Sequence, residues 1–157
     1  MALSTKAPIQ STTIREFTPA DFDAVLPIIQ QSRLQHQLEP FDISQLQQEF
    51  LDSNRFRLVA VDNDGAVVGS GILSAEDPQQ RLGRVSRIYI TPQHHGTGVG
   101  RDLVSQLIEY AYVQNMQQLT LTTRLQFDRA ARFYQSLGFS VTHIDPDTGQ
   151  IHMVRVL

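Results

Sequence analysis

Three glycines at alternate positions, Gly96, Gly98 and Gly100, follow a strand-like segment and a proline and precede a segment with helical periodicity. A turn of this kind directs backbone N–H groups toward one point at the positive end of a helix dipole, where phosphate oxygens bind. The dipole contributes roughly 0.3–1 kcal/mol, and each hydrogen bond to a charged acceptor adds about 1.5–3 kcal/mol. Several converging amides are therefore expected to hold a diphosphate without a metal or a lysine.

Two other glycine-rich phosphate loops do not fit this segment. The Walker pattern requires Lys followed by Ser or Thr after its last glycine, whereas Arg101 and Asp102 follow Gly100. The dinucleotide-binding pattern G-x-G-x-x-G is missed because the spacing here is G-x-G-x-G and no opening βαβ unit precedes it. The alternatives that remain are a diphosphate-binding turn and a tight strand-to-helix turn that binds nothing.

The strands that must position this loop are indicated by runs rich in β-branched and aromatic residues. These runs predict strands at 12–17, 55–62, 66–75, 84–91, 119–123, 139–144 and 151–157. Two turns predict hairpins, one at Asn63-Asp64-Gly65 and one around Asp147-Thr148-Gly149. Gly69 and Gly71 lie inside a predicted strand and indicate a bulge or a close approach of the backbone.

Helices are indicated by apolar residues at spacings of three to four. Thr18-Pro19 predicts the start of one helix, and Ser44 with Gln47 resembles a capping box for a short second helix. A long helix is expected from about 98 to 114, and another over 128–137 that ends at Gly138. A strand, a long helix and a strand in the middle of the chain predict a parallel pair, whereas the hairpins predict antiparallel pairs. The sheet is therefore expected to be mixed.

Composition narrows the class of protein. With 157 residues, 41% of them apolar, the chain has the size of one domain, which we place at residues 12–157 after a flexible arm at 1–11. A net charge of −3 argues against a nucleic-acid partner. The sequence has no cysteine and no run long enough to span a membrane. We expect a cytoplasmic protein with no membrane partner.

The loop resembles the acetyl-CoA signature of the GNAT family of N-acetyltransferases, which is Gln or Arg, two residues, Gly, one residue, then Gly or Ala. The preferred frame is His95-Gly96-Thr97-Gly98-Val99-Gly100, with His at the usual Gln or Arg position. A second frame, Gln93-His94-His95-Gly96-Thr97-Gly98, matches the same pattern closer to the proline. The family's segment A-x-x-F-Y-x-x-x-G-F is similar to Ala130 through Phe139, although Phe127 occupies a position where the family often has Asn.

The resemblance implies a fold and an activity. The fold is α/β (α+β), with a central mixed, mostly antiparallel sheet, helices on both faces and a splayed parallel strand pair. The activity is transfer of an acetyl group from acetyl-CoA, the cosubstrate, to a primary amine of a small molecule or protein by direct attack in a ternary complex. The alternative is a catalytically silent module that binds or senses acyl-CoA, and a homodimer is left open.

The resemblance also assigns site residues. Cofactor binding falls on the strand residues Ile88, Tyr89 and Ile90 and on the loop residues His95, Gly96, Thr97, Gly98, Val99, Gly100 and Arg101. Tyr134 corresponds to the family tyrosine that protonates the leaving thiolate, and it is the expected catalytic residue.

The group that takes the proton of the amine is open. The strand before the loop carries no carboxylate, so Glu76, His94, His143 and ordered water are the alternatives. Adjacent His94 and His95 do not predict a metal site because neighbouring loop side chains diverge and no third ligand has suitable spacing. Acidic residues between 39 and 52 indicate a polar face, and an acidic rim there would suit a cationic amine.

Overall fold

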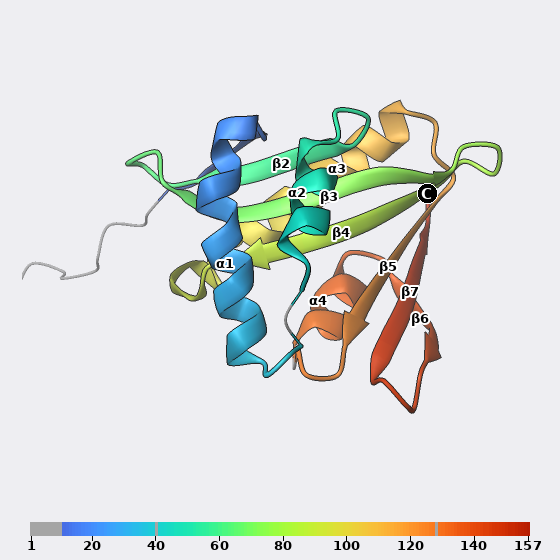
Figure 1. The fold of residues 1–157 in the computed structure, drawn as a ribbon. Helices are drawn as coiled ribbons and strands as arrows, with labels where there is room; N and C mark the ends of the chain where they lie inside the picture. The colour runs from blue at the N-terminus through green and yellow to red at the C-terminus, as the bar shows by residue number, and fades with distance from the viewer. Residues whose placement is uncertain (1–10, 40, 128) are drawn as a thin grey trace, which may run out of the picture.

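A seven-stranded sheet runs through the protein in the order β1-β2-β3-β4-β5-β7-β6 (Figure 1). The computed structural model describes residues 11–39, 41–127 and 129–157. Neighbouring strands are antiparallel except for β4 and β5, which are parallel and linked by a helical crossover. The predicted mixed sheet and its parallel pair are therefore confirmed. The strand bounds are β1 Thr13–Glu16, β2 Phe56–Val61, β3 Val67–Asp77, β4 Leu82–Ile90, β5 Gln118–Arg124, β6 Ser140–Ile144 and β7 Gln150–Val156.

Helices cover both faces of the sheet. One apolar cluster joins the sheet to α1 (Phe22–Gln35) and α2 (Ile43–Leu51), and a second joins it to α3 (Val99–Val113) and α4 (Ala130–Ser136). In Figure 1, α1 and α2 lie in front of β2–β4, whereas the same face of β5–β7 carries no helix. The long helix predicted from 98 to 114 is confirmed as α3. Short 3₁₀ turns, Pro19–Asp21 and Pro92–His94, precede α1 and the glycine loop.

The predicted start of α2 is wrong by two residues. Asp42, not Ser44, is the N-cap: its backbone is extended, and its Oδ1 accepts a hydrogen bond of 3.3 Å from the Gln45 amide. Ser44 lies inside the first turn, where a helical backbone does not allow the N-cap geometry. Most of the predicted arm at 1–11 lies outside the described residues, as do Pro40 and Asp128. Ser11 is described, and its hydroxyl hydrogen-bonds Asn63 at 2.8 Å.

A bulge in β4 is the feature that shapes the site. Arg87 and Ile88 of β4 stand opposite Gly71 of β3, and Arg87 has a φ of +55°. The buried Ser70 hydroxyl donates a hydrogen bond of 2.9 Å to the Arg87 carbonyl and holds the bulge. A Cβ at Gly71 would lie 2.5 Å from the Leu103 side chain, so only glycine fits there. The predicted bulge is thus confirmed, and bulges bend the strand that carries them.

The parallel strands β4 and β5 are paired only at their beginnings. The pairing covers three positions and ends where Arg84 lies beside Thr120, although β4 continues to Ile90 and β5 to Arg124. In Figure 1 the two strands diverge beyond this point. All residues of β4 from Ser86 to Ile90 are partly exposed. This strand edge therefore keeps unpaired backbone groups, as expected for a splayed parallel pair.

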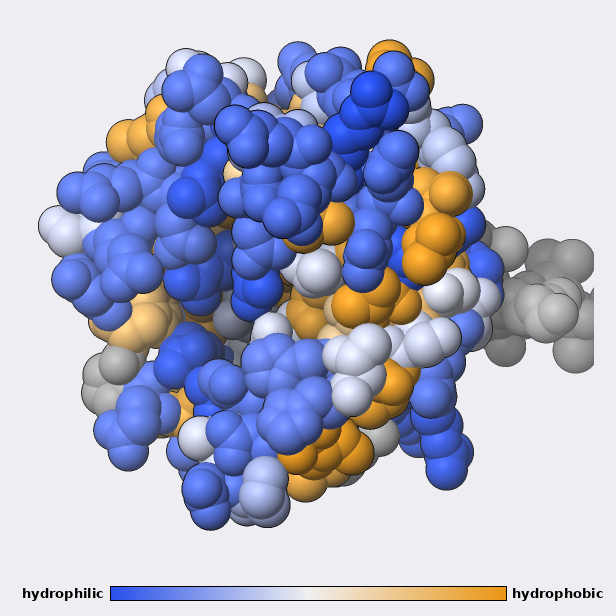
Figure 2. All heavy atoms as spheres, turned by 90° about the vertical axis from the view of Figure 1, so that its right-hand side faces the viewer, coloured by the Kyte–Doolittle hydropathy of each residue, from blue (hydrophilic) through white to orange (hydrophobic). Residues whose placement is uncertain are grey.

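The surface is mixed in character. Figure 2 shows one side of the protein, on which hydrophilic residues cover most of the area and hydrophobic residues gather near the centre. Large exposed apolar side chains among the described residues include Val113 and Val156. Within the described ranges, no helix combines the length and the apolar character that crossing a bilayer requires.

An ion pair at the start of α1 gives folding stability a defined pH dependence. Arg15 donates hydrogen bonds of 2.8 and 2.9 Å to Asp21, and the Thr18 amide adds one of 2.7 Å. These bonds, with those from Arg15 foremost, lower the pKa of Asp21 from 3.8 to about 2. Because the folded-state pKa lies below the unfolded value, this stabilisation is present above about pH 4 and is lost as the pH falls toward about 2.

We therefore expect Asp21→Asn to unfold at a lower urea concentration than the wild type at neutral pH. The difference should shrink as the pH approaches 3, because the wild-type carboxylate then begins to take up a proton. Urea titrations at pH 7, 5 and 3 measure this trend. A difference in unfolding free energy that is the same at all three pH values would contradict the role given to Asp21.

Candidate active site

The glycine loop leads from β4 into α3. Gly96 and Gly98 have φ angles of +74° and +88°, and Gly98 is the left-handed N-cap of α3. No described atom lies within 4 Å of a Cβ built at either position, so the backbone angle, rather than crowding by the protein, requires glycine here. Gly100 differs from both: its Cβ would make an ordinary contact of 3.5 Å with Phe133, which leaves space for alanine.

Six consecutive backbone amides of this loop, from Gly96 to Arg101, donate to no acceptor among the described residues. The first helical hydrogen bond is that of the Asp102 amide to the Gly98 carbonyl at 3.0 Å, so the amides of Val99, Gly100 and Arg101 are the usual unsatisfied donors of a helix N-terminus. Gly96, Thr97 and Gly98 are exposed. The loop therefore presents a row of donors suited to an anion.

His95 differs from the loop residues that follow it because both its amide and its ring bond to backbone carbonyls. Its amide donates to the Pro92 carbonyl at 3.2 Å, and its ring Nε2 lies 2.8 Å from the Ile90 carbonyl. Since a carbonyl only accepts, Nε2 carries the hydrogen. The histidine found where the family signature has Gln or Arg thus ties the loop to the end of β4, and its own amide is not part of the free row.

The unpaired edge of β4 offers further backbone groups. The Thr91 amide donates to the Val68 carbonyl of β3 at 2.9 Å. Because backbone groups of successive residues point to alternate sides of a strand, Tyr89 also faces β3, whereas Ile88 and Ile90 face the side of β5. The Ile90 carbonyl is occupied by His95. The groups left for a ligand are therefore both backbone groups of Ile88 and the Ile90 amide.

The other predicted side chains of the loop bond to or pack against the protein, although Thr97 and Arg101 are exposed. The Thr97 hydroxyl donates to the His94 carbonyl at 2.6 Å, and Val99 is 2% exposed in the core. Arg101 donates to the Ser136 hydroxyl of α4 at 3.2 Å, which ties the beginning of α3 to the end of α4. The loop can therefore contact a ligand mainly through its backbone.

Tyr134 lies on α4 within the core cluster below the loop. Its ring meets Phe133 and Phe139 edge-on at 5.1 and 5.9 Å, and it is 8% exposed. Burial, and to a lesser degree the Tyr89 phenol, raises the pKa of Tyr134 above its usual value. Tyr89 packs against the cluster on the opposite face of the sheet. Tyr134 therefore keeps its proton at neutral pH.

The predicted proton acceptors are not gathered at one point. Glu76 accepts a hydrogen bond of 2.8 Å from Thr120, beside the paired beginning of β4 and β5. His94 is buried; its Nδ1 lies 3.0 Å from the Thr91 hydroxyl, and its Nε2 has no partner among the described residues. His143 is exposed on β6. The side chains of His94 and His95 diverge, the first into the core and the second toward solvent.

The expected acidic rim near α2 is partly neutralised by arginines. Glu49 accepts hydrogen bonds of 2.7 and 3.3 Å from Arg87. Burial lowers the pKa of Arg87, but these hydrogen bonds and the charge of Glu49 outweigh it and raise the pKa. Asp52 is bridged to Arg55 at 3.2 Å, and Asp42 caps α2. Arg87 is far from α2 in the sequence and Arg55 follows it, so the helical periodicity of α2 does not indicate these pairings.

Two contacts near the site were not anticipated. Phe127, which replaces the family's Asn, meets the His36 ring of α1 edge-on at 4.6 Å and so links α1 to the loop after β5. Arg84, Thr122 and His152 form a hydrogen-bonded chain across three strands. Its only signal in the sequence is the alternation of polar residues along 118–124, which indicates one polar face of that strand.

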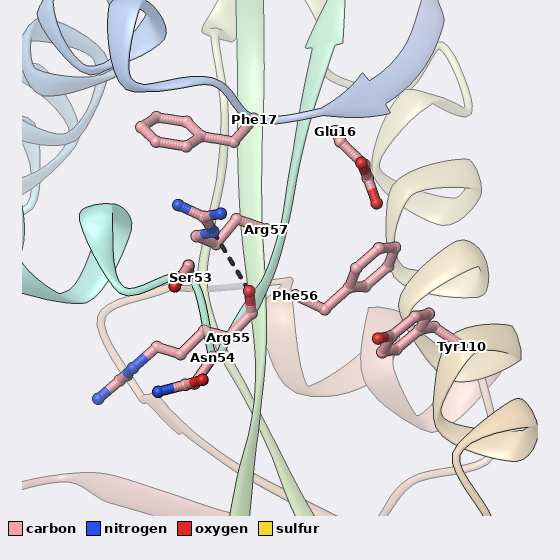
Figure 3. A pocket seen from close by; sticks show the side chains of 8 residues that line it. All are labelled: Glu16, Phe17, Ser53, Asn54, Arg55, Phe56, Arg57 and Tyr110. Carbon is pink, nitrogen blue, oxygen red and sulfur yellow. Dashed lines mark hydrogen bonds between the residues drawn. The ribbon is translucent and has the colours of Figure 1, made fainter.

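A separate cavity of about 230 Å³ lies at the other end of the sheet (Figure 3). The Phe56 ring stacks on Tyr110 at 3.7 Å on one side, and the Arg57 guanidinium lies 5.3 Å from the centre of the Phe17 ring on the other. Phe56 is aligned through Leu73 with Val85, early in β4, whereas the glycine loop follows the end of β4. This cavity is therefore distinct from the loop site.

Comparisons with known proteins concern the family and the fold of this chain. The model of the acetyltransferase (GNAT) family matches residues 22–139. An uncharacterized N-acetyltransferase of Mycobacterium bovis is 29% identical over 93 residues, which are 59% of this chain and 58% of that relative. The chain thus matches less than two thirds of the length of this curated relative.

Two crystal structures show the same fold. A GNAT-family acetyltransferase of Staphylococcus aureus has a TM-score of 0.81 at 17% identity, covering 94% of this chain and 99% of that one. A phosphinothricin acetyltransferase of Sinorhizobium meliloti, solved in complex with AcCoA, has a TM-score of 0.77 at 22% identity, covering 93% and 88%.

Proposed function

Because this chain belongs to the acetyltransferase (GNAT) family, we propose that it transfers the acetyl group of acetyl-CoA to a primary amine. The observation that carries the proposal is the row of six amides from Gly96 to Arg101 with no acceptor among the described residues. A diphosphate is the part of acetyl-CoA that such a row suits. The structural relative in complex with AcCoA supports the choice of cosubstrate.

The residues fit a long, thin ligand as well as its diphosphate. We assign the diphosphate to the amides of 96–101 and the amide groups of the pantetheine arm to the free backbone groups of Ile88 and Ile90. Pairing with a strand edge satisfies backbone groups that would otherwise have only water. His95 holds the loop against the end of β4 and in this way keeps the two parts of the binding site in a fixed relation.

Tyr134 is the proposed partner of the leaving sulfur. In the reaction the amine nitrogen forms a bond to the acetyl carbon, the carbon–sulfur bond breaks, and the amine proton passes to solvent. The raised pKa of Tyr134 means that its hydroxyl arrives protonated and donates a hydrogen bond to the thiolate that forms. Because a thiol has a pKa of about 8.5, stabilisation by this hydrogen bond, rather than complete proton transfer, is the contribution that we assign to Tyr134.

Ordered water is the proposed acceptor of the amine proton. An alkylammonium group has a pKa near 10, so its deprotonation at pH 7 costs about 4 kcal/mol. Two side chains are unsuited to accept this proton, because Glu49 is held by Arg87 and His94 is buried. Glu76 lies beside the paired part of β4 and β5. Water is neither paired nor buried in this way, and it reaches the partly exposed stretch of β4 from Ser86 to Ile90.

The proposal is tested by adding acetyl-CoA to the protein and following both its melting temperature and the release of free thiol with a panel of amines. Ligand at about 100 times its Kd stabilises a folded protein by about 2.7 kcal/mol, so the melting temperature should rise by several degrees. No shift at millimolar acetyl-CoA would contradict the proposal. A shift without thiol release on any amine would favour a silent acyl-CoA-binding module instead.

A further inference from the structure

A hydrogen-bonded chain of side chains crosses β4, β5 and β7. Alternation along these strands places it opposite the α3 and α4 cluster. This is the face that α1 and α2 cover over β2–β4 and that carries no helix over β5–β7 (Figure 1). Nη2 of Arg84 donates to the Thr122 hydroxyl at 3.1 Å, and this hydroxyl lies 3.4 Å from Nδ1 of His152. All three residues are partly exposed, and Thr122 stands directly opposite His152 in the sheet. The chain therefore forms a polar floor that solvent and ligands can reach.

The direction of these hydrogen bonds determines what the floor can bind. A guanidinium group only donates, so Thr122 accepts from Arg84. Its hydroxyl keeps one hydrogen and one lone pair, so it can pair with Nδ1 of His152 in either tautomer of the ring. When the imidazole carries its hydrogen on Nε2, the Thr122 hydroxyl donates to Nδ1 and Nε2 is a donor. This atom has no partner among the described residues, yet it is not among their buried unpaired atoms, so it reaches solvent. In this tautomer the chain ends in a donor that solvent reaches.

Unlike nearby Arg87, Arg84 has several N–H groups with no acceptor among the described residues. Arg87 is held by Glu49 through two hydrogen bonds. Arg84 makes one hydrogen bond to the described residues, and its side chain is 39% exposed. It also forms an ion pair with Glu76, whose closest N···O distance of 3.7 Å is too long for a hydrogen bond. Glu76 is itself engaged by Thr120 at 2.8 Å. Most of the five N–H groups of Arg84 are therefore open to a ligand.

The position of Arg84 relates it to the proposed reaction site. Its backbone lies beside Thr120 in the last paired position of β4 and β5, but its guanidinium reaches Thr122, two residues further along β5. The side chain thus leans toward the unpaired stretch of β4, which contains the backbone groups that we assign to the acyl carrier. A ligand bound by Arg84 and His152 would lie along the same strands as the acetyl group.

We propose that Arg84 and His152 bind a carboxylate of the acceptor, and that the acceptor is therefore an amino acid or another primary amine with a carboxylate close to it. This inference rests on the proposed acetyl transfer. A guanidinium fork and an imidazole N–H match the two oxygens of a carboxylate. A polyamine would place a second positive charge beside Arg84, and Glu76, the carboxylate 3.7 Å from Arg84, already balances the guanidinium charge.

The test measures the acetylation of L-amino acids that have acidic, basic, polar and apolar side chains. Each amino acid is compared with its own carboxamide at saturating acetyl-CoA. We expect kcat/KM for at least one acid to exceed that of its amide by tenfold or more. Arg84→Gln should lower kcat/KM for the acid by about 10- to 100-fold, the range of a charged hydrogen bond. It should leave the amide rate and the KM for acetyl-CoA nearly unchanged. Thr122→Val should give a smaller loss of the same kind.

Arg81→Gln is the matched control. It removes the same charge from an exposed turn three residues earlier, so it should leave the ratio of acid to amide rates unchanged. The inference alone would be overturned if acids and amides reacted equally well, if only polyamines were acetylated, or if Arg84→Gln lowered both rates alike. Failure of the wild-type protein to bind acetyl-CoA would instead overturn the proposed function and this inference with it.

Discussion

Gly98→Ala is expected to weaken the binding of CoA by about tenfold or more. The position has a φ of +88°, and an L-residue in the left-handed region costs roughly 1–2 kcal/mol, which favours a loop with differently directed amides. In the binding conformation, the new methyl group would also occupy space that no described protein atom fills and that we assign to the ligand. Calorimetric titration with CoA measures the effect directly.

Gly65→Ala provides the control for this substitution. Gly65 has a φ of +80° in the turn between β2 and β3, and a Cβ added there would also have no described atom within 4 Å. The two substitutions should therefore introduce similar backbone strain and lower the melting temperature to a similar extent. Only Gly98→Ala should weaken CoA binding. Equal affinities of both variants for CoA would argue against the glycine loop as the diphosphate site.

Tyr134→Phe is expected to lower kcat by about 10²- to 10³-fold, the usual loss when a donor to a developing negative charge is removed. The KM for acetyl-CoA should change little, because the ring and its contacts with Phe133 and Phe139 stay in place. Steady-state kinetics with saturating amine measure both parameters. The effect should fall on kcat because the thiolate charge exists only as the carbon–sulfur bond breaks.

A matched Tyr-to-Phe control is available on α3. Tyr112 is 51% exposed, so Tyr112→Phe should leave kcat within about twofold of the wild type, as for most surface substitutions. A wild-type kcat in Tyr134→Phe would remove this residue from the mechanism. Another donor would then have to stabilise the thiolate.

The local parts of this structure could be predicted from the sequence. Apolar spacing and the glycines predicted α3 to within one residue at each end, because a helix N-terminus at Gly98 requires a left-handed backbone that glycine adopts. Gly69 and Gly71 inside a strand indicated a bulge or a close approach of the backbone, and the structure shows both at Gly71. Alternate glycines between a strand and a helix indicated the glycine loop.

The parts that depend on distant contacts could not be predicted in this way. Arg87 pairs with Glu49 across 38 positions, and Arg84 contacts Thr122 across the same separation. Neither pairing follows from periodicity, because each depends on the register of strands and on how α2 lies over the sheet. The capping of α2 by Asp42 was missed for a different reason: several polar residues in a row offer alternative N-caps, and the tertiary structure selects one of them.

A crystal structure of the protein with bound CoA tests the central claim most directly. The account predicts that diphosphate oxygens accept hydrogen bonds from amides between Gly96 and Arg101, and that the pantetheine arm lies along the unpaired edge of β4 at Ile88. CoA bound in the cavity beside Phe56, or loop amides that in the complex donate to carbonyls of the protein itself, would contradict it.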